Sequence, residues 1–202
     1  MPKISVRTRK ISLDEMIEIG FEPQRIETYC KACSNYGKNW SCPPHFFDRE
    51  SFLNTHPYIV LVIAVLEYSK DEILRNRGRE EVDKYTTKTL FPLRRAFYEK
   101  LKKIERYNTD LRIFDIGNCN LCETCSREEG GACVKPDEMR YSPESLGFDV
   151  SLLLGSCFDL NLEWAGEVLP SHYISLGGLA QRSDTNITGL EELEAELVRE
   201  FS

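Results

Sequence analysis

The sequence lacks the features that mark membrane-spanning, secreted and non-specific nucleic-acid-binding proteins. Its longest apolar run, residues 58–66, has about half the length that a transmembrane helix needs. Residues 1–7 contain no apolar segment of the kind that a secretory signal requires. Acidic residues outnumber basic ones by 33 to 26, and the net charge of −7 repels the phosphates of nucleic acid. We therefore expect a cytoplasmic protein with no membrane partner and no nucleic-acid partner.

Nucleotide-binding and histidine-based motifs are also missing. No G-x-G-x-x-G or Walker A pattern occurs, and the three histidines (His45, His56 and His172) show no spacing typical of a metal site or a catalytic triad. The sequence has no internal repeat and no low-complexity linker. With 41 % hydrophobic and 29 % charged residues, a chain of 202 residues can bury a core. We expect residues 1–202 to form one domain.

Hydrophobic periodicity predicts a strand, a long helix and a second strand. Residues 59–66 are apolar and β-branched, as in a buried central strand. After a charged, helical stretch at 70–84, apolar side chains recur at steps of three and four between residues 90 and 104, the stripe of an amphipathic helix. Residues 111–116 alternate like a strand. This order favours a β–α–β crossover.

Capping residues predict three further helices, and an acidic amphipathic segment predicts a fourth. These helices span residues 12–20, 142–147, 149–157 and 189–202. Residues 172–176 are a third strand, which Gly177 and Gly178 would end. The elements together predict an α/β fold, with α+β as the alternative. It would have a small central sheet, flanking helices and cysteine-rich metal-binding loops.

The chain has eight cysteines. That density is too low for a small disulfide scaffold, and a reducing cytosol favours thiolate ligands over disulfides. Seven of the eight fall into two groups, the first within residues 30–44 and the second within residues 119–136. We therefore expect two metal-binding loops.

The second cysteine group has the spacing of a ferredoxin. Cys119, Cys122 and Cys125 form a C-x2-C-x2-C pattern, which brings three thiolates to three corners of one cuboidal cluster. Flexible backbone at residues 130–131, both glycine, would bring Cys133 round as the fourth ligand. This pattern predicts a 4Fe–4S cluster. The alternative is a zinc site, for which the third closely spaced cysteine is surplus.

The first cysteine group has three members, Cys30, Cys33 and Cys42. Three cysteines do not saturate a tetrahedral site, so a fourth ligand would come from Cys157 or, second, from His45. Otherwise one corner of the site is open to solvent or substrate. The pairing is open as well, because the cysteine before a proline ligates the other cluster in two-cluster ferredoxins. Cys42 precedes a proline, and it would then join the 119/122/125 set and leave Cys133 to the first group.

Two segments resemble an uncharacterised family of archaeal and bacterial predicted metal-binding proteins. The first is C-K-A-C-S-N-Y-G-K-N-W-S-C-P-P at residues 30–44, and the second is C-V-K-P-D-E-M-R-Y-S-P-E-S-L-G-F-D-V at residues 133–150. The likeness covers most of the chain, from about residue 25 to residue 180. The resemblance implies cysteine-bound metal, generally taken to be iron–sulfur, and it supplies no reaction.

Two cationic residues are expected to stabilise an anionic, thiolate-bound cluster from close by. Lys38 lies between the cysteines of the first group. Arg140 follows the second group and precedes the helix cap at Ser142. We expect both side chains to lie beside the metal ligands.

These patterns favour an iron–sulfur protein with one or two 4Fe–4S clusters that transfers electrons to a partner enzyme. The alternative is an enzyme in which the first group alone holds a cluster with an open iron. That iron would serve sulfur transfer, dehydration or a reductive step on a small-molecule substrate. The third hypothesis is a zinc-stabilised interaction module. The sequence names no catalytic residue, redox partner, substrate or oligomeric state.

Overall fold

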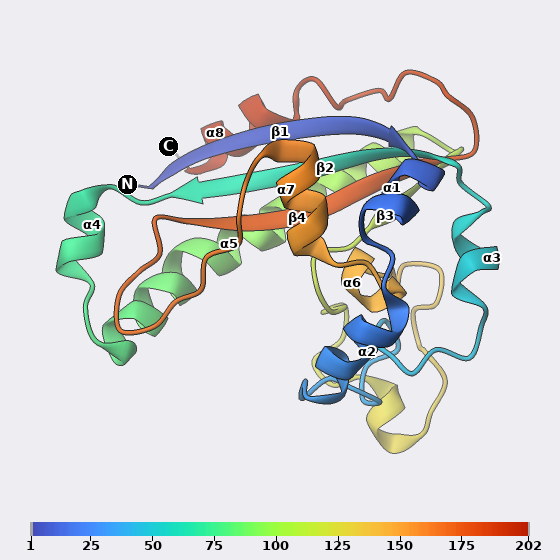
Figure 1. Cartoon of the computed structure of the whole chain (residues 1–202), viewed down its shortest axis with the longest axis horizontal. Helices are drawn as coiled ribbons and strands as arrows, with labels where there is room; N and C mark the ends of the chain where they lie inside the picture. The colour runs from blue at the N-terminus through green and yellow to red at the C-terminus, as the bar shows by residue number, and fades with distance from the viewer. Residues whose placement is uncertain (1, 202) are drawn as a thin grey trace.

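A computed structural model describes residues 2–201 and places four strands in one sheet (Figure 1). The strands in spatial order are β1 (Lys3–Ser12), β2 (Tyr58–Glu67), β4 (His172–Gln181) and β3 (Leu111–Phe114). Every neighbouring pair is antiparallel. The helices are α1 (Leu13–Gly20), α2 (Pro23–Lys31), α3 (Arg49–Leu53), α4 (Lys70–Arg75), α5 (Arg79–Tyr107), α6 (Pro143–Leu146), α7 (Val150–Phe158) and α8 (Leu193–Phe201), with a 3-10 turn η1 at Ser126–Glu129.

Strand β2 is buried on both faces, as its unbroken apolar run predicts. Its residues 59–66 are all buried, and alternate side chains enter two different cores. Val60 and Val62 point into a core shared with α5 and α8, whereas Leu61 and Ile63 point into a core shared with α1 and α7. Because side chains alternate across a strand, helices on both faces require apolar residues at every position.

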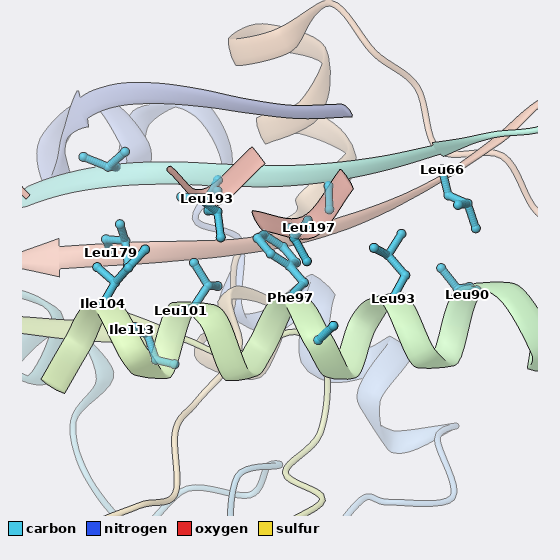
Figure 2. Close-up of a cluster of buried hydrophobic side chains, with 14 of the residues drawn as sticks. Leu66, Leu90, Leu93, Phe97, Leu101, Ile104, Ile113, Leu179, Leu193 and Leu197 are labelled. Atoms are coloured by element: carbon cyan, nitrogen blue, oxygen red, sulfur yellow. The ribbon is translucent and has the colours of Figure 1, made fainter. Parts of the chain in front are cut away.

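Helix α5 presents the predicted apolar stripe to the sheet. Figure 2 shows Leu93, Phe97 and Leu101 directed from one side of the helix toward the strands and toward Leu193 and Leu197 of α8. All five of these side chains are at least 98 % buried. Contact between this stripe and the sheet fixes α5 beneath β4 and β2, with its last turn beside β3.

The predicted crossover is present in split form. Strands β2 and β3 are each antiparallel to β4, so they run parallel to one another with β4 between them. Helix α5 connects them. The α/β fold class, with a central sheet, flanking helices and cysteine-bearing loops, is thus confirmed. The ends of the expected 1–202 domain, Met1 and Ser202, lie outside the described residues.

The expectation that residues 177–178 end a strand was wrong, because both glycines lie inside β4. They are there for close packing. A Cβ atom on Gly177 would come within 2.8 Å of Leu101 Cδ1, and one on Gly178 would come within 2.8 Å of Phe114 Cδ2. Glycine therefore lets α5 and β3 approach the backbone of β4 more closely than any side chain would allow.

Several boundaries differ from those expected. The N-terminal strand β1 and helices α2 and α3 were not predicted. The 70–84 stretch is divided between α4 and the start of α5, and the last helix begins at Leu193 rather than at residue 189. The caps at Ser12, Ser142 and Asp149 are confirmed, since each side chain accepts a hydrogen bond from its own helix.

The two cysteine-bearing loops lie together beyond one end of the sheet. In Figure 1 the blue loop after α2 and the yellow segment around η1 meet below the strands. Within residues 2–201, no helix combines the length and the apolar character that crossing a bilayer requires.

Truncation of Phe97 tests the core between α5 and the sheet. Phe97→Ala leaves a cavity at a fully buried position, and we expect a loss of about 3–5 kcal/mol in the free energy of unfolding. Phe91→Ala is the matched control, because Phe91 lies on the same helix and is 54 % exposed. Denaturant unfolding measures both variants, and equal losses would contradict the described orientation of α5.

Candidate metal centre

The second cysteine group surrounds one cavity in the loop that follows β3. Cys119, Cys122, Cys125 and Cys133 all line this cavity, which has a volume of about 150 Å³ and is called the cysteine cavity below. All four side chains are partly exposed, so the cavity lies at the molecular surface. Lys38 and Lys135 contribute to the same wall.

Cys119 has the surroundings of a thiolate ligand. The backbone N–H of Leu121 donates a hydrogen bond to its sulfur, which favours the charged form. Burial acts in the opposite direction and, with no metal bound, raises the pKa of this thiol. Metal binding would therefore release a proton from Cys119, as it does from most thiol ligands.

A tight bend returns the chain so that Cys133 reaches the cysteine cavity. Turn η1 ends at Gly130, whose φ of +74° is a left-handed conformation that favours glycine. The N–H of Gly131 donates to the carbonyl of Ser126 (2.8 Å), and the Ser126 hydroxyl donates to the carbonyl of Ala132 (2.6 Å). The bend lies at the two glycines to which the sequence analysis assigned it.

The first cysteine group lies at the end of α2 and in the loop after it. Cys30 is in the last turn of the helix, and the N–H of Cys33 donates to its carbonyl (2.9 Å). Burial raises the pKa of Cys30, with the Cys33 thiol as the next largest cause. Burial raises the pKa of Cys42 to about 11, against a contact with the Ser41 hydroxyl (4.0 Å) that favours the thiolate.

The structure keeps the two cysteine groups apart in the way their order along the chain suggests. Cys30 and Cys33 both act electrostatically on Cys42, whereas Cys122 and Cys133 act on Cys119. Cys133 lines one cavity together with the three other cysteines of the second group. Within residues 2–201, no three His, Cys, Asp or Glu side chains converge closely enough to hold a single metal ion.

The two candidates for a fourth ligand of the first group, Cys157 and His45, both have other partners. Cys157 is on α7, packs against the core on the α1 side of the sheet, and has Arg9 and Glu15 as its charged neighbours. His45 faces the rings of Phe47 and Tyr141. Its Nε2 atom is 2.7 Å from the carbonyl of Ser145. Cys157 thus packs with the core on the α1 side of the sheet, and the His45 imidazole contacts the Ser145 carbonyl.

Hydrogen bonds join the two loops at Cys119. The Ser41 hydroxyl accepts a bond from the Cys119 N–H (2.9 Å), and the Asn39 side-chain amide donates to the Cys119 carbonyl (2.9 Å). Asn39 and Ser41 are buried and bonded to each other. Both peptide groups next to a candidate ligand are therefore held by side chains of the other loop.

Arg127, on the second loop, also joins the two loops, and it was not predicted from the sequence. Its guanidinium donates to three carbonyls of the first loop, those of Asn39 (2.9 Å), Cys42 (2.7 Å) and Pro44 (2.7 Å). It also lies 4.9 Å from the ring centre of Trp40, whose indole N–H donates to the carbonyl of Gly131. Nothing in the local sequence distinguishes Arg127 from a surface arginine.

The two expected cationic neighbours lie in different places. Lys38 lines the cysteine cavity. Arg140 is buried and forms a two-bond ion pair with Glu105 of α5 (2.7 and 2.9 Å), which also binds Lys102. Arg140 therefore anchors the segment after Cys133 to the long helix.

A buried polar cluster lies behind the second loop. Asp115 is 5 % exposed, and burial raises its pKa to about 7. Among the surrounding charges, that of Glu144 raises the pKa of Asp115 further and that of Arg94 lowers it. Oε2 of Glu144 and the hydroxyl of Tyr98 are buried and, among the described residues, have no hydrogen-bond partner. Such atoms are few in native proteins, so the cluster has unused capacity to bind a polar group.

The fold and the two adjoining sets of thiols define an α/β protein with cysteine-rich loops suited to metal. The chain belongs to the family described as "Predicted metal-binding protein (DUF2284)", whose model matches residues 15–176. That range includes both segments on which the resemblance rested. Neither a curated protein nor a solved structure matches this chain.

Replacement of Asp115 tests the buried polar cluster. Its folded-state pKa of about 7 lies above the unfolded value of about 3.9. Its contribution to stability is therefore complete below pH 4 and is lost as the pH rises through 7. We expect Asp115→Asn to gain stability relative to the wild type between pH 4 and pH 8, by a few kcal/mol. Urea unfolding across this range measures the difference, and a constant difference would refute the buried acid.

Replacement of Arg127 tests the contact between the loops. Arg127→Gln removes charge-assisted bonds to three carbonyls, and we expect a loss of about 1–3 kcal/mol in the free energy of unfolding. The exposed Arg75 provides a control, since Arg75→Gln changes the net charge equally. If the two variants unfold at the same denaturant concentration, Arg127 does not hold the loops together.

Proposed function

We propose that this protein binds a 4Fe–4S cluster in the cysteine cavity and a second metal cofactor at the first cysteine group, and that it transfers electrons to a partner protein. The observation that carries the proposal is the placement of Cys119, Cys122, Cys125 and Cys133 around one cavity. Four thiolates are the usual ligand set of such a cluster, and the C-x2-C-x2-C spacing is that of bacterial ferredoxins. When bound, the cluster would supply one-electron chemistry.

The residues around the cavity fit an anionic group. The Leu121 N–H already donates to the Cys119 sulfur. Lys38 and Lys135 supply positive charge, and the Lys135 ammonium is fixed by a bond to the carbonyl of Leu121 (3.2 Å). Donors and cations beside the sulfurs favour the reduced, more negative state, and so would raise the reduction potential.

Electron transfer also requires that a partner can approach. The cysteine cavity opens at the surface, and Val134 on its wall is 68 % exposed. Phe46, which packs against Trp40 and Arg127, is 80 % exposed. These apolar side chains give a partner a place to exclude water near the ligands.

An enzymatic role is the second candidate, and the number of cysteines in the first group and the exposure of Cys33 favour it. The first group has only three cysteines, and Cys33 is exposed to solvent. A metal held by these three thiolates would keep one position for a substrate. A spectral change at one of two centres on addition of a small molecule would distinguish this role from electron transfer.

Chemical analysis of matched cysteine variants tests the proposal. Protein purified without oxygen should contain about eight irons and eight acid-labile sulfides per chain if both groups hold cubane clusters, or about four if only the cysteine cavity does. We expect Cys122→Ser to lose the iron of the cysteine cavity. Cys157→Ser is the control, because Cys157 lies outside both groups, and it should retain the wild-type iron content.

Two results would overturn the proposal. One is stoichiometric zinc without sulfide, which would instead indicate a zinc-stabilised interaction module. The other is a cluster that a low-potential electron donor does not reduce, as measured by electron paramagnetic resonance. Equal iron loss in Cys122→Ser and Cys157→Ser would contradict the assignment of ligands.

A further inference from the structure

A second kind of site lies on the other side of Arg140, at the end of α5 and beside the edge strand β3. A cavity of about 580 Å³ opens there and is called the cationic cavity below. Five of its side chains are cationic and one is a carboxylate. They are Lys102, Arg106, Arg112, Arg140 and Arg182, with Glu105 as the carboxylate.

Most of the positive charge in the cationic cavity is not neutralised. Lys102 and Arg140 share the single carboxylate of Glu105. Within residues 2–201, the guanidinium groups of the three other arginines form no salt bridge. Asp110, which is adjacent in sequence to the cavity residues Thr109 and Leu111, accepts a hydrogen bond from the Ser183 N–H (3.0 Å). In a chain with a net charge of −7, this concentration of unpaired arginines marks a place that attracts anions.

His56 lines the same cavity as Arg112 and Arg182. Burial lowers the pKa of His56, and the charges of Arg182 and Arg112 lower it further. The charge of Asp110 acts on this pKa in the opposite direction. Arg106, Arg112 and Arg182 are exposed, and all three line this one open cavity.

An apolar pocket opens from the cationic cavity. Its volume is about 280 Å³, and it shares four residues with the cationic cavity. The shared residues are Phe52, His56, Arg112 and Arg140. Apolar walls come from Ile113 and Phe114 of β3 and from the ring of Tyr141. A charged mouth thus leads to an interior suited to a planar or hydrocarbon group.

We propose that the cationic cavity and the apolar pocket together bind a small organic anion, with its phosphate or carboxylate on the arginines and its apolar part against the wall formed by Phe52, Phe114 and Tyr141. Arginine matches the planar geometry of both anionic groups and donates two bonds to each. An apolar pocket by itself discriminates weakly between ligands. The arginines at its mouth would therefore supply the specificity and fix the orientation of the ligand.

The position of this site relates it to the cysteine cavity. Met139 lines both the apolar pocket and the cysteine cavity, so one side chain separates the two spaces. A ligand in the pocket would lie next to the candidate metal centre. The binding proposal does not depend on the metal, because every residue that it uses lies outside the two cysteine groups.

Calorimetric titration with phenyl phosphate tests the proposal on the full-length protein. We expect saturable binding with a Kd of about 1 mM or tighter. Arg112→Gln should weaken it about tenfold or more, because a charge-assisted bond is lost. Arg199→Gln is the matched control: it removes the same charge from exposed α8, and its affinity should equal that of the wild type.

Two further probes separate the charged mouth from the apolar pocket. Inorganic phosphate should bind more weakly than phenyl phosphate, because it leaves the pocket empty. Benzyl alcohol, which has the ring without the charge, should not compete with phenyl phosphate. Benzoate should compete, and whichever of the two anions binds more tightly identifies the preferred head group.

Nuclear magnetic resonance localises the probe. The ring signals of His56 should move on addition of phenyl phosphate, whereas those of His172 should not. The proposal is overturned if neither anion shows saturable binding, if Arg199→Gln weakens binding as much as Arg112→Gln, or if His56 does not respond. The iron content of Arg112→Gln should equal that of the wild type, which keeps this test separate from that of the metal centre.

Discussion

The hydrogen bonds between residues 39–44 and residues 119–127 are the constraint on which the candidate metal centre depends. Both peptide groups flanking Cys119 are held by buried side chains of the first loop, and Arg127 returns three bonds to carbonyls of that loop. Ligands on irregular loops converge only if their backbones are fixed. Here two loops about 80 residues apart in the chain fix each other.

The sheet and α5 serve as the platform that brings these loops together. Because β2 is buried on both faces, helices pack on each side, and the loops that follow α2 and β3 meet below the strands (Figure 1). Gly177 and Gly178 let α5 and β3 pack directly against β4, which sets where the second loop begins. Arg140 then joins the end of that loop to Glu105 on α5.

Burial patterns made much of the fold predictable. The continuous apolar run of β2 and the apolar stripe on α5 both indicate burial against a core. Capping residues such as Ser12 indicate where helices begin. Strand β1 was missed because Ile4 and Val6 are only partly buried and the charged and polar residues 7–10 follow them. The role of Gly177 was predicted wrongly because glycine occurs both in turns and where another segment packs closely against a strand, and the sequence does not distinguish the two cases.

The candidate site was predictable only in part, for a related reason. The spacing of cysteines carries their grouping, because residues close in sequence are close in space. The partnership of Asn39 and Ser41 with Cys119, and of Arg127 with the first loop, involves residues distant in sequence and leaves no local pattern. Likewise the cationic cavity gathers arginines from α5, β3 and the end of β4, which no single segment reveals.

X-ray diffraction from crystals grown without oxygen, with anomalous data collected at the iron and zinc absorption edges, tests the central claim most directly. The account predicts an iron signal inside the cysteine cavity, bounded by Cys119, Cys122, Cys125 and Cys133, and a separate metal signal beside Cys30, Cys33 and Cys42. A zinc signal in the cysteine cavity, or iron bound jointly by Cys42 and the 119/122/125 set with Cys133 left free, would contradict it.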